Sequence, residues 1–165
     1  VAKILKLKKN LLVKTLKKFK GLKYRQEKIF QSKKLTIIND SKATTFSSSV
    51  SLLKSLTNVH WIVGGQAKKG DKLLLSKKDC KNIKAYIFGT NKNFFISKLK
   101  KLMRYEYFLD LKSLVKKLSL EIKVDKNRIH KTILFSPSAA SFDNFKNFEE
   151  RGKYFNDLIK KYINA

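Results

Sequence analysis

Cysteine, proline, glycine and acidic residues are all scarce in this chain of 165 residues. The single cysteine, Cys80, cannot form an intramolecular disulfide, which excludes a disulfide-stabilised secreted domain and favours a reducing cytoplasm. Six glycines and one proline, Pro137, are too few for a low-complexity linker. No apolar run approaches the roughly 18 residues that span a bilayer. We therefore expect a cytoplasmic protein that does not engage a membrane.

Basic residues outnumber acidic ones by 39 to 12, which gives a formal net charge of +27. Such an excess is typical of proteins that bind nucleic acid or anionic membranes. The excess is almost entirely lysine, spread over nearly every segment, and the arginines are Arg25, Arg104, Arg128 and Arg151. Because arginine is the residue that reads phosphates and bases in a bidentate manner, a solvated lysine-rich surface without specific nucleic-acid binding is favoured. A lysine-rich, non-enzymatic nucleic-acid-binding module is the alternative.

Hydrophobic patterns predict an alternation of strands and helices. The expected strands are 28–32, 35–40, 58–65, 84–89, 105–109 and 131–137, and the expected helices are 11–19, 43–56, 76–82, 92–101, 111–122 and about 144–163. A tight turn makes the first two strands antiparallel, whereas helical crossovers make the later strands parallel. The sequence therefore predicts an α/β fold with a mostly parallel sheet and helices on both faces.

Three polar clusters directly follow three of these strands. They are Asn39, Asp40, Ser41, Lys42 and Thr44; then Gly64, Gly65, Gln66 and Lys68; then Ser136, Pro137, Ser138 and Ser141. Parallel strands end at the same edge of a sheet, where ligands bind, so we expect one shared site. Helices follow the first and last clusters, and their amino termini together with Lys42 and Lys68 predict recognition of a carboxylate or a phosphate. Taken singly, Ser41 or Ser141 could equally be a helix cap.

The sequence contains no recognisable nucleotide-binding loop, metal site or catalytic triad. The stretch "GGQAKKGDK" (64–72) fails as a Walker A loop, because counting from Gly65 places Gly70, Asp71 and Lys72 where Gly, Lys and a hydroxyl residue are required. This chain is therefore not expected to hold ATP unaided. His60 and His130 fall near strand starts, at the opposite edge from the clusters, and no Cys or carboxylate lies at metal-ligand spacing. The sequence supports neither a metal site nor a Ser/His/Asp triad.

Four motifs resemble the C-terminal domain of the Mur ligases of peptidoglycan synthesis. They are "GLKYRQE" (21–27), "INDSKAT" (38–44), "IVGGQAKKGD" (62–71) and "LFSPSAASFDNFKNFEERGKYF" (134–155). The resemblance spans residues 21 to about 160. It points to the members that add D-glutamate, because the sister ligases usually have an Asp-Tyr-Ala-His sequence where this chain has Asp40-Ser41-Lys42-Ala43.

The resemblance implies an ATP-dependent amide ligase of three domains, whose substrates are D-glutamate, ATP and UDP-N-acetylmuramoyl-L-alanine. Residues 21–165 would be its C-terminal domain, with a Rossmann-like sheet and one antiparallel edge strand. Residues 1–20 would be the helical tail of the central domain, which binds most of the ATP and Mg²⁺. The chain begins with Val1 instead of Met, so we expect a fragment of a longer protein. Because the phosphate loop and metal ligands are absent, the fragment should be inactive alone, and we expect a monomer.

The same resemblance assigns roles to individual residues. Towards ATP lie Tyr24, Arg25, Asn39 and Asp40, with Arg25 at the phosphates and Asp40 at the ribose. Lys42 would be catalytic and face the reacting phosphate. The D-glutamate pocket would consist of Thr44, Lys68, Ser141, Phe142 and Phe148, with Lys68 binding one carboxylate and Ser141 the other.

Two positions depart from the family pattern. The family usually has Pro-His where this chain has Lys23 and Tyr24, so a role of that histidine does not transfer. Ser138 replaces the usual Cys of the "SPACAS" motif, which is an exchange of one small residue for another.

Overall fold

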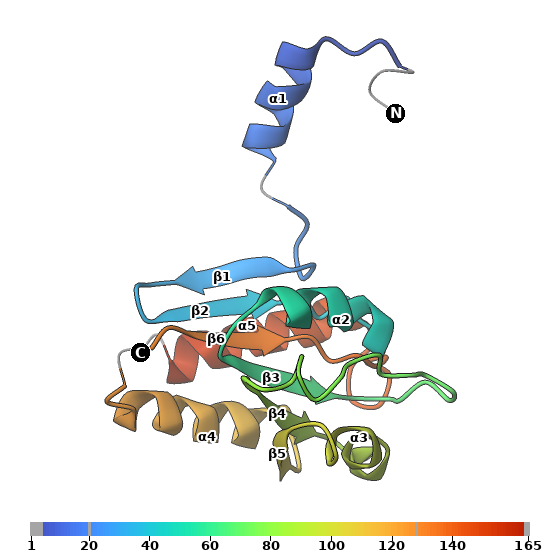
Figure 1. Ribbon diagram of the computed structural model, residues 1–165, viewed down its shortest axis with the longest axis vertical. Coiled ribbons are helices and arrows are strands. Elements are labelled where there is room, and N and C mark those ends of the chain that lie inside the picture. Colours follow the sequence, from blue (N-terminus) through green and yellow to red (C-terminus); the bar gives the residue numbers. More distant parts are fainter. Residues whose placement is uncertain (1–4, 20, 128, 164–165) are drawn as a thin grey trace.

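A six-stranded sheet lies at the centre of the protein, in a computed structural model that describes residues 5–19, 21–127 and 129–163 (Figure 1). The strand order is β1-β2-β6-β3-β4-β5. The strands are β1 (Glu27–Gln31), β2 (Leu35–Asn39), β3 (Val59–Gly64), β4 (Ile83–Phe88), β5 (Arg104–Phe108) and β6 (Lys131–Phe135). Only β1, at one edge, pairs with its neighbour in the antiparallel sense. The predicted α/β fold with one antiparallel edge strand is confirmed.

Two pairs of helices cover the two faces of the sheet. They are α2 (Phe46–Ser55) with α3 (Lys92–Leu99), and α4 (Leu111–Val124) with α5 (Phe148–Tyr162). Side chains alternate between the faces along each strand. On β3, Trp61 packs with α2 and α3, and its neighbour Ile62 packs with α4 and α5. Each face therefore has its own apolar core, and the strands β2, β6, β3 and β4 between them are almost wholly buried, whereas the edge strand β5 is not.

The first helix, α1 (Lys9–Lys18), stands away from the sheet (Figure 1). It contains no buried residue, and Leu11, Leu16 and Phe19 are 60–64% exposed. The helix expected at 11–19 is present and spans Lys9–Lys18. Its assignment to a preceding domain stays a prediction, and residues 1–4 and 20 of the expected 1–20 tail lie outside the described residues, as does Arg128.

Two predicted helices differ from the structure. Residues 77–82 form successive turns instead of a helix. The Asp79 carboxylate accepts hydrogen bonds from the Ser76 backbone and hydroxyl, and the buried Cys80 then leads into β4. The β3–β4 crossover consequently has no helix. The last helix was expected from about residue 144 but begins at Phe148, because the side chain of Asn147 caps it by accepting from the Glu150 N–H.

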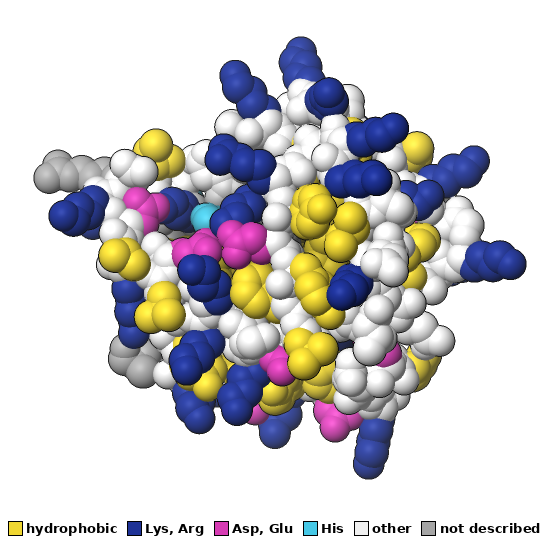
Figure 2. Space-filling model, turned by 90° about the horizontal axis from the view of Figure 1, so that it is seen from below, with side chains coloured by type: hydrophobic (Ala, Val, Ile, Leu, Met, Phe, Trp, Pro, Cys, Tyr) yellow, Lys and Arg dark blue, Asp and Glu magenta, His cyan; other side chains and the backbone are white. Residues whose placement is uncertain are grey.

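Lysines are distributed over the surface instead of being gathered on one face. Figure 2 shows one side of the molecule, on which Lys and Arg side chains surround apolar patches and a few carboxylates. None of the helices in the described ranges is long and apolar enough to cross a membrane.

Candidate functional site at the carboxyl edge of the sheet

The loops that follow β2, β6 and β3 meet at one edge of the sheet. These strands are neighbours and all parallel, so their carboxyl ends coincide. Beyond the strands, Gln66 and Ala140 exchange two backbone hydrogen bonds of 2.9 and 3.0 Å, and the Gly64 N–H donates to the Pro137 carbonyl. The predicted convergence of the three polar clusters is confirmed.

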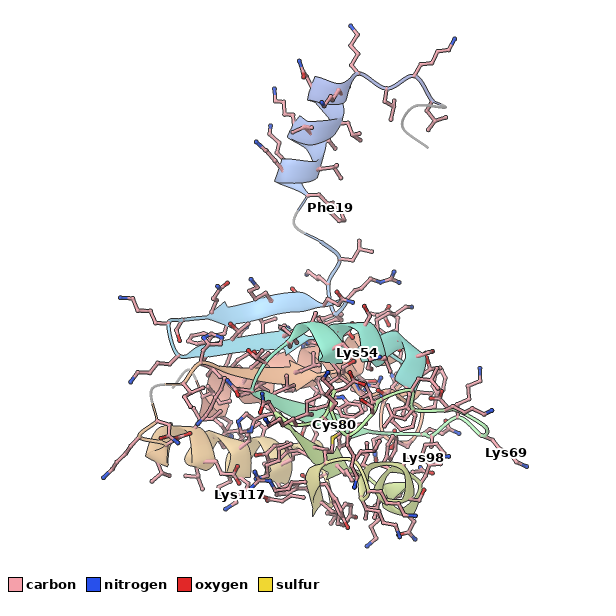
Figure 3. All side chains as sticks on the ribbon, in the orientation of Figure 1. Phe19, Lys54, Lys69, Cys80, Lys98 and Lys117 are labelled. Atoms are coloured by element: carbon pink, nitrogen blue, oxygen red, sulfur yellow. The ribbon has the colours of Figure 1, made fainter. Side chains whose placement is uncertain are left out.

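A shallow pocket of about 330 Å³ lies between these loops. Its lining comes from all three of them and includes Thr44, Gln66, Lys68 and Ala140. Thr44 and Lys68 are exposed, and no described carboxylate forms a salt bridge with Lys68. A hydroxyl and an unneutralised ammonium group beside each other suit an anionic ligand. The next lysine, Lys69, sits at the tip of the same loop and does not line the pocket (Figure 3).

Two glycines allow the loop after β3 to pass this closely. A Cβ atom on Gly64 would lie 2.2 Å from the Phe88 carbonyl oxygen, and one on Gly65 would lie 2.7 Å from the Ala140 carbonyl oxygen. Both residues also have positive φ, of 151° and 121°, which disfavours any side chain. The sequence "GG" is therefore required by geometry.

Beneath the pocket, four polar side chains form a buried hydrogen-bonded chain. Ser136 donates to the Asp40 carboxylate at 2.8 Å, and Ser49 lies 2.6 Å from both Ser136 and Ser138. Because the ionised carboxylate can only accept, Ser49 donates to Ser136 and Ser138 donates to Ser49. Ser136 and Ser138, expected to face a ligand, are instead 0% and 1% exposed and fix the loop after β6 to α2.

The residues assigned to ATP fall into a buried pair and an accessible pair. Asn39 is 0% exposed and donates to Gly152 and Asn156 of α5. Asp40 is 4% exposed and also accepts from the Gln26 N–H. Burial raises the pKa of Asp40, although the hydrogen bonds from Ser136 and Gln26 and the charge of Arg25 oppose the shift. Its predicted contact with the ribose stays a prediction.

Tyr24 and Arg25 form the accessible pair. Arg25 is exposed, whereas the half-buried Tyr24 ring packs so closely on Gly152 that a Cβ there would lie 2.4 Å from the ring. The Tyr24 carbonyl accepts from the Lys42 N–H at 3.0 Å. This segment is therefore attached to both the loop after β2 and helix α5.

Lys42 and Phe148, assigned to catalysis and to D-glutamate respectively, contact each other. The Lys42 ammonium lies 3.8 Å from the centroid of the Phe148 ring, which is a cation–π contact. Ser41 donates to the Phe148 carbonyl at 2.9 Å. The exposed Lys42 amine is thus held at the start of α5, apart from the Thr44–Lys68 pocket.

Ser141 and Phe142 follow Ala140 directly but differ in exposure. Ser141 is 3% exposed, and its carbonyl accepts from Asn144 and Phe145, so it begins the turn that leads to α5. Phe142 is 71% exposed. The structure thus places Ser141 beside the pocket lining, and the D-glutamate contacts of both residues stay predictions.

Arg151 is the main feature that the sequence did not reveal. It is 0% exposed and donates to the Ser41 hydroxyl, the Ser41 carbonyl and the Ala139 carbonyl at 2.8–3.1 Å. It therefore ties the loops after β2 and β6 to α5. A signal was available, because Arg151 lies three residues after Phe148 and four before Phe155, within the apolar side of the helix.

Asp143 is the charged neighbour of Arg151. Its two carboxylate oxygens and Arg151 Nη1 are buried without a hydrogen-bond partner in the described structure. Burial raises the pKa of Asp143 and lowers that of Arg151 to about 10, and each charge opposes the other's shift. The two groups thus stabilise each other electrostatically without a direct bond.

The amino terminus of α2 does not face the pocket as an open anion site. Its first N–H, on Phe46, donates at 2.7 Å to the carboxylate of Asp71. Asp71 belongs to the loop after β3, where its own N–H donates to the Lys68 carbonyl. The protein itself therefore supplies the anion at this helix terminus, and Lys68 and Lys42 are the cations left for a ligand.

The described residues contain no group of three or more His, Cys, Asp or Glu side chains that could hold a metal ion.

Comparison with known proteins points to one enzyme. No protein-family model matches the chain. It is 36% identical over 161 residues to the UDP-N-acetylmuramoylalanine–D-glutamate ligase of Wolbachia sp. subsp. Brugia malayi, a match that covers 98% of this chain and 32% of the relative. For the enzymes of Francisella philomiragia and Rickettsia felis the identities are 36% and 33%, over 89% and 98% of this chain and 35% and 36% of the relatives. The chain thus spans about one third of the length of the relatives it matches.

Proposed function

Because the chain belongs to the family of the UDP-N-acetylmuramoylalanine–D-glutamate ligases, we propose that it is the C-terminal, D-glutamate-binding part of such a ligase. The observation that carries the proposal is the meeting of three loops at the carboxyl edge of the sheet, with Thr44 and Lys68 in one pocket and Ser141 beside it. D-glutamate carries two carboxylates, and an unpaired lysine is a suitable partner for one of them.

In the proposed reaction the amine of D-glutamate attacks an activated carboxyl group of UDP-N-acetylmuramoyl-L-alanine, and an amide bond replaces the bond to the leaving group. ATP supplies that activation when it is bound. The part of this chain is to hold the amine donor: Lys68 pairs with one carboxylate, Ser141 and the backbone near Phe142 bind the other, and Thr44 orients the molecule. Lys42, whose ammonium group contacts the Phe148 ring, is proposed to act on the reacting groups.

The groups that activate the substrate would come from outside this chain. The sequence has no Walker A loop, and the described residues have no cluster fit for Mg²⁺. Near ATP, Arg25 and Tyr24 are the accessible candidates. We propose that the chain acts in the cytoplasm as part of a longer, monomeric protein. Because the activating groups would come from outside the chain, it should have no ligase activity by itself.

Replacing Lys68 tests this proposal in a complete ligase that contains the chain. In the proposal, bound D-glutamate buries the exposed Lys68 ammonium, and loss of one partner from a buried, hydrogen-bonded charge pair costs roughly 2–5 kcal/mol. Lys68→Ala should therefore lower kcat/KM for D-glutamate by at least about 30-fold, with a much smaller change in KM for ATP.

Lys69→Ala is the matched control, because it removes the same charge from the same loop outside the pocket. This substitution should leave kcat/KM for D-glutamate almost unchanged. Equal losses in the two variants would show that general charge matters and not a D-glutamate contact.

A further inference from the structure

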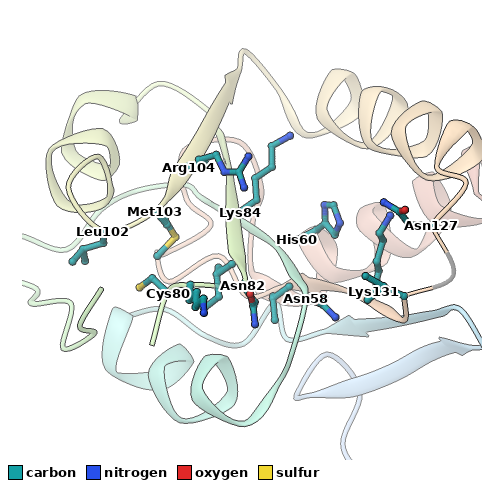
Figure 4. Close-up of a pocket in the computed structure, with 14 residues that line it drawn as sticks. Asn58, His60, Cys80, Asn82, Lys84, Leu102, Met103, Arg104, Asn127 and Lys131 are labelled. Carbon is teal, nitrogen blue, oxygen red and sulfur yellow. The ribbon is translucent and has the colours of Figure 1, made fainter. Parts of the chain in front are cut away.

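A second pocket, of about 500 Å³, lies at the opposite edge of the sheet (Figure 4). It is formed where β3, β4, β5 and β6 begin, whereas the candidate D-glutamate site lies beyond the ends of strands. His60, Lys81, Lys84, Arg104 and Lys131 are among its lining residues, and none of the lining residues is acidic. This pocket has no part in the proposed ligase reaction.

Its polar wall is a row of side chains across three neighbouring strands. His60 of β3 is in register with Lys84 of β4, and Lys84 is in register with Arg104 of β5. Residues in register on adjacent strands share one face of the sheet, with Cβ atoms about 5 Å apart. An imidazole, an ammonium and a guanidinium group therefore stand side by side, as Figure 4 shows.

Hydrogen bonding fixes the tautomer of His60. The Tyr86 hydroxyl donates its single proton to the Glu121 carboxylate at 2.7 Å, so it can only accept from His60 Nδ1, which lies 2.9 Å away. His60 Nε2 then carries a lone pair, and it has no hydrogen-bond partner among the described residues. The pocket thus contains a hydrogen-bond acceptor surrounded by cations.

Several charged groups act on His60. Lys131 of β6 and Lys84 of β4 oppose a positive charge on it, whereas Glu121 of α4 favours one. Burial is the largest cause and, with the two lysines, lowers the pKa of His60 to about 4. The imidazole is therefore neutral at pH 7, and its Nε2 lone pair can accept a hydrogen bond from a ligand.

The cations of the pocket differ in how far they are already neutralised. Lys84 lies 2.6 Å from the Glu106 carboxylate and 3.4 Å from that of Glu121, and Lys131 pairs with Asp125. Arg104 and Lys81 form no salt bridge with the described residues. Two positive charges thus remain available to an anion.

We propose that this pocket binds the phosphate group of a small ligand, with a protonated phosphate oxygen donating to His60 Nε2 and the charged oxygens facing Arg104 and Lys81. A phosphate monoester has a second pKa near 6, so at mildly acidic to neutral pH it offers both an O–H donor and negative charge. A carboxylate or a phosphodiester is fully ionised at that pH and lacks the donor. The chemistry of the pocket therefore selects phosphate monoesters or inorganic phosphate over carboxylates and over a nucleic-acid backbone.

The chain has two histidines, which makes the imidazole signals a direct test. His130 contacts Thr36 and the Lys33 carbonyl and does not line the pocket, so it serves as an internal control. Inorganic phosphate and phenyl phosphate at pH 6.5 should shift the His60 ring resonances saturably and raise the imidazole pKa of His60. The ring resonances of His130 should stay in place. Acetate and dimethyl phosphate at equal ionic strength should have no such effect.

Arg104→Gln should weaken phosphate binding about tenfold, because it removes one unneutralised charge from an exposed position. Lys112→Gln, an equal charge change on the exposed side of α4, should not alter it. The proposal is overturned if phosphate shifts both histidines alike, if dimethyl phosphate or acetate binds equally well, or if Arg104→Gln and Lys112→Gln behave in the same way.

Discussion

Arg151 shows how a single buried residue can hold a binding site without contacting the ligand. Its guanidinium group bridges Ser41 in the loop after β2 and Ala139 in the loop after β6. The Thr44–Lys68 pocket opens between the same loops and the loop after β3. The position of the pocket walls therefore depends on this arginine.

Arg151→Met should reduce the free energy of unfolding by about 3–5 kcal/mol, because three acceptors lose their donor and Asp143 loses its opposing charge. Urea denaturation measures the change. Lys153→Met is the control on the same helix: its amine is exposed and 3.9 Å from Asp157, so the expected loss is below about 0.5 kcal/mol. Similar losses in both variants would contradict the bridging role.

His60 should make stability depend on pH. Its folded-state pKa of about 4 lies below the ordinary value of 6.5, so the unfolded chain takes up a proton first as pH falls. Stability should therefore be complete above about pH 6.5 and fall between pH 6.5 and 4, by at most about 3 kcal/mol. Urea denaturation at several pH values, in phosphate-free buffer, measures this slope.

His60→Gln lacks the titrating group, so its unfolding free energy should depend less on pH in that window. Asp40 has a raised pKa, so it makes the folded protein more stable as the pH falls. The quantity to compare is therefore the difference in unfolding free energy between the unmutated protein and His60→Gln at each pH. Parallel pH profiles would exclude His60 as the source.

At the scale of elements, the loop after β3 and helix α2 form one connected unit. The Asp71 carboxylate accepts the first N–H of α2 and lies three residues after Lys68. A carboxylate at a helix amino terminus is stabilised by both the hydrogen bond and the helix dipole. Lys68 is thereby positioned by helix α2 as well as by its own loop.

Asp71→Ala should lower the unfolding free energy by about 1–2 kcal/mol, and Asp71→Asn by less, because the amide keeps an acceptor but not the charge. In a complete ligase, Asp71→Ala should also raise KM for D-glutamate. Thermal unfolding and steady-state kinetics measure these effects. Lys72→Ala, at the exposed neighbouring position, should change neither, and equivalence of the two alanine variants would refute the connection.

The sequence predicted most elements because their patterns are local. Strands such as 58–65 and 84–89 are apolar runs bounded by turn residues, and parallel strands necessarily bring their ends together. Residues 76–82 were wrongly expected to form a helix. A Ser followed three residues later by an Asp is typical of a helix start, but here the Ser76–Asp79 hydrogen bond closes a turn that does not continue as a helix. The start of α5 was misplaced because Phe145 continues the helical spacing of Phe148 and Phe155 towards the amino terminus, whereas Asn147 caps the helix after it.

The site was predictable only in part, because exposure depends on packing between distant segments. Thr44 and Lys68 could be placed because each follows a strand that was expected to be parallel, and they do line one pocket. Ser136 and Ser138 follow the end of a strand, as ligand-binding serines often do. In the structure they are buried, because their hydroxyls form hydrogen bonds with Ser49 of α2. Arg151 was overlooked since a lone arginine in a lysine-rich helix is usually on the surface.

For the whole molecule, the net charge of +27 leaves few carboxylates to neutralise the lysines. Two places at opposite edges of the sheet keep unpaired cations next to hydrogen-bonding groups: the Thr44–Lys68 pocket and the His60–Arg104 pocket. On the face that Figure 2 shows, the lysines lie between other side chains without forming a single patch. We therefore propose specific anion binding at these two sites, and the remaining lysines serve as solvated surface residues.

The central claim is that three loops of this chain form the D-glutamate site, and a titration with the two enantiomers of glutamate tests it most directly. Amide spectra of the labelled chain should show saturable shifts at Thr44, Lys68 and Ser141 with D-glutamate. L-glutamate at the same concentration should give much smaller shifts, and Lys68→Ala should abolish the response to D-glutamate. Equal responses to both enantiomers, or shifts confined to residues outside these loops, would contradict the claim.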